Sequence, residues 1–127
     1  MKPPLKYVID ASVAVKWFSK FEEDVDRSEE LMNSYIEGKC SLVSPSLLLY
    51  ELSNALRFNP NFKREEVTKA IESLLKLRLE LVDFQEVFGQ AAELAFSKDI
   101  TMYDAVYIAV SQMYHVPLVT ADYKLLE

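Results

Sequence analysis

Hydrophobic and polar residues change their spacing several times along the chain, which predicts alternating strands and helices. Short apolar or alternating runs predict strands over 6–9, 41–43, 79–84 and 117–120. Helical spacing predicts helices over 11–18, from the acidic stretch that begins at 21 to about residue 37, and over 46–58, 63–76, 85–97 and 101–114. Strands separated by helices are typical of parallel βαβ units. We therefore expect the α/β class, as a three-layer α/β/α sandwich around a central parallel sheet.

Local signals predict where some helices begin and end. The run Ser44-Pro45-Ser46 is typical of a helix start, because proline fits the first turn, where its missing N–H has no partner to lose. Gly38 is typical of the residue that stops a helix. In the helix over 63–76, an apolar stripe predicts the buried face, formed by Val67, Ala70, Ile71, Leu74 and Leu75.

Length and composition predict a single domain over 1–127, with half of its residues hydrophobic and 27% charged. No apolar run approaches the ~18 residues that span a bilayer, and the first ten residues lack the apolar core of a signal peptide. We therefore expect a cytoplasmic protein with no membrane partner. One cysteine and one histidine exclude an internal disulfide and cysteine-cluster or polyhistidine metal sites.

The net charge of −6 argues against broad electrostatic attraction to a nucleic-acid backbone. A nucleic-acid substrate would need local basic residues or bound cations. With only two glycines, a glycine-rich phosphate loop is excluded as well.

Four carboxylates lie in apolar surroundings, unlike most of the 20 acidic residues: Asp10, Glu51, Asp104 and Asp122. Asp104, in TMYDAVYIAV, belongs to a segment that is apolar nearly all round, which predicts a buried helix. An unpaired carboxylate there costs several kcal/mol, so a partner or a cation is expected.

Two of these carboxylates, Asp10 and Asp122, directly follow predicted parallel strands, whose carboxyl ends form ligand sites in such sheets. If Glu51 and Asp104 point to the same edge from flanking helices, four negative charges converge and repel one another. Divalent cations remove that repulsion. Oxygen ligands without histidine or cysteine favour Mg²⁺ or Mn²⁺, which can activate water for phosphodiester hydrolysis.

Each carboxylate also has a purely structural alternative. Asp10 is a good N-cap for the helix that begins at Ala11, and Asp122 for a last helical turn. Glu51 has Arg57 as a possible ion-pair partner or reaches solvent beside Asn54. A structural ion pair is the weakest alternative for Asp104, because no basic residue lies within a helical turn of it.

The four positions are also where the chain resembles a known family, the PIN-domain ribonucleases, and within it the VapC-type toxins of toxin–antitoxin pairs. The segments that carry the resemblance are YVIDASVAVKWF, SPSLLLYELSNAL, DITMYDAVYIAVS and PLVTAD. The resemblance implies that Asp10, Glu51, Asp104 and Asp122 form the catalytic metal site, with Mg²⁺ or Mn²⁺ as cofactor. It also implies supporting roles for Ser12, Asn54 and Thr120.

The same resemblance implies a homodimer and a cognate antitoxin that covers the active-site groove. Chains of this family usually continue past the segment TADYKLL with a further helical segment and an edge strand, whereas this one stops at Glu127. We therefore expect a sheet of four or five strands.

The leading hypothesis is a metal-dependent endoribonuclease, the toxin of a toxin–antitoxin system, that hydrolyses RNA with water activated by the metal. Alternatives with the same fold are a solitary RNA-processing nuclease and a non-catalytic protein whose acidic pocket binds an arginine of a partner. A hydrolase or phosphoacceptor with Asp10 as nucleophile ranks last. That class typically needs a lysine after another strand, and only Lys124 closely follows the final strand.

Overall fold

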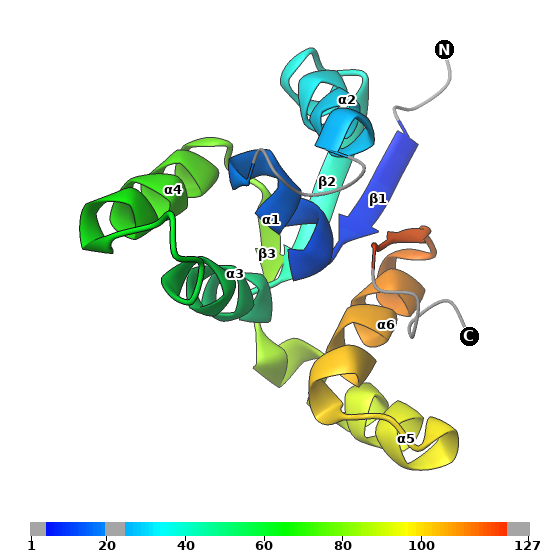
Figure 1. The fold of residues 1–127 in the computed structure, drawn as a ribbon. Coiled ribbons are helices and arrows are strands. Elements are labelled where there is room, and N and C mark those ends of the chain that lie inside the picture. The colour runs from blue at the N-terminus through cyan, green and yellow to red at the C-terminus, as the bar shows by residue number, and fades with distance from the viewer. Residues whose placement is uncertain (1–4, 20–24, 122–127) are drawn as a thin grey trace.

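Strands and helices alternate along the chain as the hydrophobic pattern predicts (Figure 1). The computed structural model describes residues 5–19 and 25–121. The elements follow in this order: β1 Leu5–Ile9, α1 Ala11–Phe18, α2 Val25–Ile36, β2 Cys40–Pro45, α3 Leu47–Arg57, α4 Arg64–Lys76, β3 Glu80–Val82, the 3-10 helix η1 Phe84–Glu86, α5 Phe88–Lys98, α6 Met102–Tyr114 and β4 Leu118–Val119.

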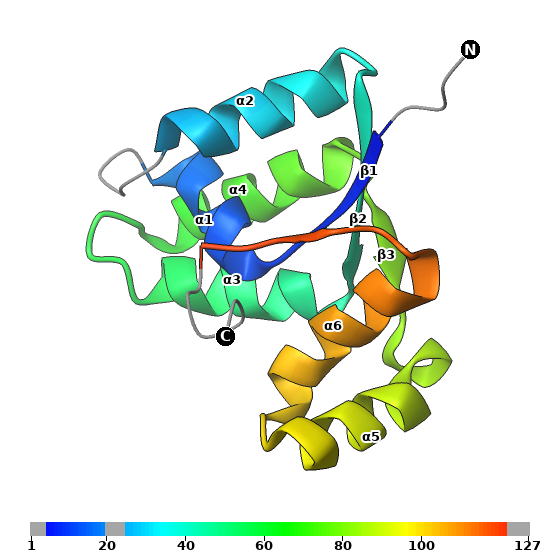
Figure 2. The ribbon, with the colours of Figure 1, turned by 90° about the vertical axis from the view of Figure 1, so that its right-hand side faces the viewer.

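The sheet is parallel throughout and has the strand order β3-β2-β1-β4. The described ranges contain four strands, the lower of the two expected numbers. Helices α1 to α4 lie on one side of the sheet, and α5 and α6 lie on the other (Figure 2). The predicted three-layer α/β/α sandwich is therefore confirmed.

Successive residues of the strands bury their side chains on opposite faces, so the domain has two cores. Val8 and Val43 pack toward α5 and α6, whereas Ile9 and Leu42 pack toward α1, α3 and α4. This double burial explains why β1 and β2 are apolar on both faces. Of the helices in the described ranges, none combines the length and apolarity that crossing a bilayer requires.

Three local predictions are wrong in detail. Pro45 ends β2 instead of starting a helix, because the strand pairing with β3 continues through Pro45 and α3 begins only at Leu47. The strand predicted over 79–84 ends at Val82, because Asp83 and Glu86 form a capping box that starts η1. Leu75 is 51% exposed despite its place in the predicted apolar stripe. The positive φ of Gly38, 78°, fits its predicted role after α2.

Candidate active site

Asp10 lies where β1 ends and α1 begins, and its side chain is only 4% exposed. Its carboxylate caps α1 by accepting a hydrogen bond from the backbone N–H of Val13 at 3.3 Å. The Ser44 hydroxyl donates to the carbonyl of Ile9 at 2.7 Å and fixes the end of β1 next to it. The capping alternative is thus correct. The capping hydrogen bond also holds the carboxylate at the carboxyl edge of the sheet.

Two hydroxyls orient the Asp10 carboxylate. Ser12 Oγ donates to Oδ1 at 2.5 Å, and Thr120 Oγ1 donates to Oδ2. The backbone N–H of Ala121 in turn donates to Ser12 Oγ at 2.8 Å. Thr120 reaches Asp10 because β4 pairs with β1. Oδ1 already accepts two hydrogen bonds, from Ser12 Oγ and the Val13 N–H, so Oδ2 is the Asp10 oxygen with more capacity left for a cation.

Glu51 lies in the second turn of α3 and is half-buried. Its Oε1 accepts a hydrogen bond of 2.6 Å from the phenol of Tyr107 on α6, and no ion pair with Arg57 is found within the described ranges. Asn54 is exposed one turn later, and no hydrogen bond of its side chain is found among those ranges. The hydrogen-bond partner of Glu51 is therefore Tyr107, and no contact that would support the predicted role of Asn54 is observed among the described residues.

Asp104 lies in the first turn of α6, where its backbone N–H donates to Thr101 Oγ1 at 3.1 Å. The prediction of a buried helix is correct for the face that contains Ala105, Val106, Tyr107, Ala109 and Val110. Asp104 itself is only partly buried, and it lies in the first turn of the helix. A carboxylate in this position also interacts favourably with the helix dipole.

The carboxylates influence one another electrostatically. Burial raises the pKa of Asp10 above its usual value, against hydrogen bonds from Ser12, Thr120 and the Val13 backbone that lower it. Burial is also the main cause that raises the pKa of Glu51, and the charges of Asp104 and Asp10 raise it further. None of the three ion pairs within the described ranges involves these carboxylates.

The residues at this edge fit a divalent cation by their chemistry. Their donors are carboxylate and hydroxyl oxygens, which Mg²⁺ and Mn²⁺ prefer, and the raised pKa values mean that the surroundings compensate the negative charge incompletely. Within 5–19 and 25–121, however, no three His, Cys, Asp or Glu side chains are grouped closely enough to hold a metal. Asp122, the fourth predicted ligand, lies outside the described residues.

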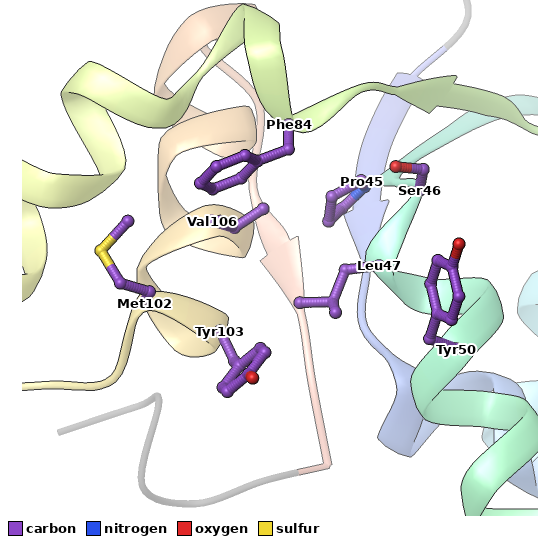
Figure 3. A pocket seen from close by; sticks show the side chains of 8 residues that line it. All are labelled: Pro45, Ser46, Leu47, Tyr50, Phe84, Met102, Tyr103 and Val106. Carbon is purple, nitrogen blue, oxygen red and sulfur yellow. The ribbon is translucent and has the colours of Figure 1, made fainter.

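An apolar groove of about 580 Å³ opens between the start of α3 and the start of α6 (Figure 3). The end of β2 and the starts of η1, α3 and α6 line it, with Pro45, Ser46, Leu47, Tyr50, Phe84, Met102, Tyr103 and Val106. Its aromatic side chains are largely exposed: Tyr50 by 76%, Tyr103 by 62% and Phe84 by 51%. Tyr50 directly precedes Glu51 and Tyr103 directly precedes Asp104 in the sequence, although neither carboxylate is among the residues that line the groove.

The parallel sheet and its acidic carboxyl edge define the class of protein. Residues 7–127 match the PIN domain, and the chain belongs to this family. The resemblance found in the sequence is therefore confirmed. The chain is 27% identical over 128 residues to Ribonuclease VapC3 of Pyrobaculum aerophilum, covering 97% of this chain and 94% of that relative.

Solved structures share the fold. VapC20 of Mycobacterium tuberculosis, described as a sarcin-ricin loop cleaving toxin, superimposes with a TM-score of 0.77 at 15% identity, covering 94% of this chain and 92% of that one. VapBC2 of Rickettsia felis, solved with a DNA fragment from its promoter, gives 0.67 at 19% identity, covering 96% and 91%.

Two residues of this region, Tyr107 and Ser44, are not among the site residues predicted from the sequence. Tyr107 belongs to the segment TMYDAVYIAV, whose pattern predicts a buried apolar helix, yet its phenol donates a hydrogen bond to Glu51. A signal was available, since a tyrosine in a buried helix needs a partner for its hydroxyl. Ser44 was read as part of a helix start, and nothing in the sequence indicates its bond to the end of β1.

Proposed function

We propose that the chain is a metal-dependent endoribonuclease in which residues 1–127 form one nuclease domain that acts in the cytoplasm. The observation that carries this proposal is the Asp10 carboxylate, held by Ser12 and Thr120 at the carboxyl edge of the parallel sheet in a member of the PIN domain family. Similarity to a ribonuclease supports RNA as the substrate. Mg²⁺ and Mn²⁺ are the proposed cofactors, because all the donors are oxygen atoms.

In this proposal the carboxylates of Asp10, Glu51, Asp104 and Asp122 hold the cations. When bound, the cations supply activation of the attacking water and stabilisation of the leaving oxygen. Ser12 and Thr120 keep the Asp10 carboxylate in one orientation through their hydrogen bonds. With a net charge of −6, the chain offers no broad attraction to phosphates, and cations bound by the carboxylates would reduce the repulsion of an RNA backbone at this edge.

Cleavage of a panel of single-stranded and stem–loop RNAs tests the proposal. We expect cleavage with Mg²⁺ or Mn²⁺ and none with excess chelator, because without a cation the negatively charged carboxylates repel the phosphate and the attacking water is not activated by a metal. Undiminished cleavage in chelator, or no cleavage of any RNA with either cation, would contradict the proposed function.

We further propose that the protein is the toxin of a toxin–antitoxin pair and a homodimer. The similarity to VapBC2, a structure of a VapBC assembly, supports an antitoxin partner. In the two alternatives it is a solitary RNA-processing nuclease or a non-catalytic protein that binds an arginine of its partner in the acidic pocket. A neighbouring small gene for a DNA-binding protein separates the toxin from the solitary nuclease, and RNA cleavage separates both from the non-catalytic protein.

The apolar groove provides a surface for an unpaired base of the RNA. Its aromatic residues adjoin the carboxylates in sequence, and neighbouring Cα atoms are about 3.8 Å apart, so a base next to the bound phosphate lies within reach. We expect Tyr103→Ala to raise KM for RNA about tenfold, since base stacking contributes roughly 1–3 kcal/mol. Tyr103→Phe, which keeps the ring, should restore the wild-type KM.

Phe96→Ala is the matched control for this groove, because Phe96 is 88% exposed on α5 and does not line it. An unchanged KM in Tyr103→Ala would contradict the prediction that an RNA base binds in the groove. If sedimentation shows that Tyr103→Ala instead dissociates a dimer, the groove is an interface between two copies of the chain.

A further inference from the structure

Tyr107 connects the segments that carry the described carboxylates. It lies on α6 three residues after Asp104, so both side chains project from the same side of that helix. Its phenol donates to Glu51 Oε1 on α3 at 2.6 Å. The backbone of Ala11, the residue after Asp10, also forms a hydrogen bond with this phenol. One side chain therefore links α1, α3 and α6 at the carboxyl edge of the sheet.

The phenol is a fixed, neutral donor in this position. Tyr107 is only 2% exposed, so water does not readily replace Glu51 as the hydrogen-bond partner of its phenol. A tyrosine hydroxyl can donate one hydrogen bond, and Tyr107 gives it to Glu51. Because Oε1 already accepts this hydrogen bond, Oε2 has more acceptor capacity left for a cation.

We propose that Tyr107 is a positioning residue that holds Glu51 toward Asp10 and Asp104 for cation binding. Like charges favour a Glu51 side chain turned away from the other two carboxylates, and the phenol opposes that rotation. This inference rests on the proposed function, since it assigns Tyr107 a role in the cation site. Partners that orient metal-binding carboxylates typically affect metal affinity by 10- to 100-fold when they are removed.

The test is Mn²⁺ binding to the full chain, measured by titration calorimetry without RNA at a temperature where every variant is folded. We expect Tyr107→Phe to weaken Mn²⁺ binding about tenfold. If Tyr107 acts through Glu51, the same substitution changes nothing further in a Glu51→Gln background. Additive losses in the double variant would overturn the proposed role, as would wild-type affinity in Tyr107→Phe.

Tyr35→Phe is the matched control, because it also removes a phenol hydrogen bond, here to the carbonyl of Leu77 at 2.7 Å, far along the chain from the carboxylates. We expect it to lower thermal stability and leave Mn²⁺ affinity unchanged. Equal loss of Mn²⁺ affinity in this control would mean that Tyr107→Phe acts through the stability of the fold, which overturns the proposal. A wild-type chain that neither binds Mn²⁺ nor cleaves RNA would contradict the proposed function itself.

Discussion

The substitution Asp10→Asn should reduce RNA cleavage by about three orders of magnitude, which corresponds to about 4 kcal/mol of lost transition-state stabilisation. Asp10 is the most buried of the described carboxylates, and Ser12 and Thr120 fix its orientation. Asparagine keeps the shape and the capping oxygen but removes the charge that a cation requires. Initial rates with Mg²⁺ and Mn²⁺ measure this effect.

The same variant should fold at least as stably as the wild-type chain when no metal is present. The pKa of Asp10 is raised in the folded state, so the folded chain binds more protons than the unfolded chain between the ordinary value of 3.8 and the raised value. Wild-type stability therefore falls as the pH rises through this window, whereas Asp10→Asn lacks that loss. Denaturant unfolding at several pH values should show that the advantage of the variant increases with pH.

Asp99→Asn is the control for Asp10→Asn, because it removes one negative charge from an exposed position at the end of α5. Asp99 has a positive φ of 53°, which asparagine tolerates well, so neither fold nor cleavage should change. Wild-type cleavage by Asp10→Asn, or a collapse of its fold, would contradict the role assigned to Asp10.

Mn²⁺ should stabilise the metal-free chain strongly. At about 100 times the dissociation constant, a ligand that binds only the folded state adds about 2.7 kcal/mol. For a domain of this size, that gain corresponds to an increase in Tm of roughly 8 °C. The physical cause is relief of the repulsion and desolvation that raise the pKa of Asp10 and Glu51. Thermal melts monitored by circular dichroism with and without Mn²⁺ measure the shift.

The double variant Asp10→Asn, Asp104→Asn should lose this Mn²⁺ shift, and Asp99→Asn should keep it. An equal shift in the double variant would mean that Mn²⁺ binds elsewhere on this acidic chain.

Much of the architecture could be predicted from residue spacing alone. The helix Ala11–Phe18 is found with the predicted bounds, and the alternation of strands and helices gives the parallel sheet. Predictions were less accurate where tertiary contacts determine an element's end. Pro45 carries a strong local helix-start signal, yet pairing with β3 keeps it in β2.

The sequence predicts which residues belong to the candidate site, but it does not predict which of them contact one another. Asp10 stood out because it follows a buried strand, and its contact with Thr120 depends on the placement of β4 beside β1. The partner of Glu51 was not predictable from neighbouring residues, because Tyr107 is 56 positions away along the chain. Asn54 illustrates the opposite case, since proximity in sequence to Glu51 brought no observed contact.

The central claim is that the carboxylates at the end of the sheet bind a divalent cation. Anomalous diffraction from a crystal of the full chain soaked in Mn²⁺ tests it most directly, because the signal locates the ion independently of activity. We predict an Mn²⁺ peak in contact with carboxylate oxygens of Asp10 and Asp104, at the carboxyl end of β1. An ordered site without a peak there under saturating Mn²⁺ would contradict the claim.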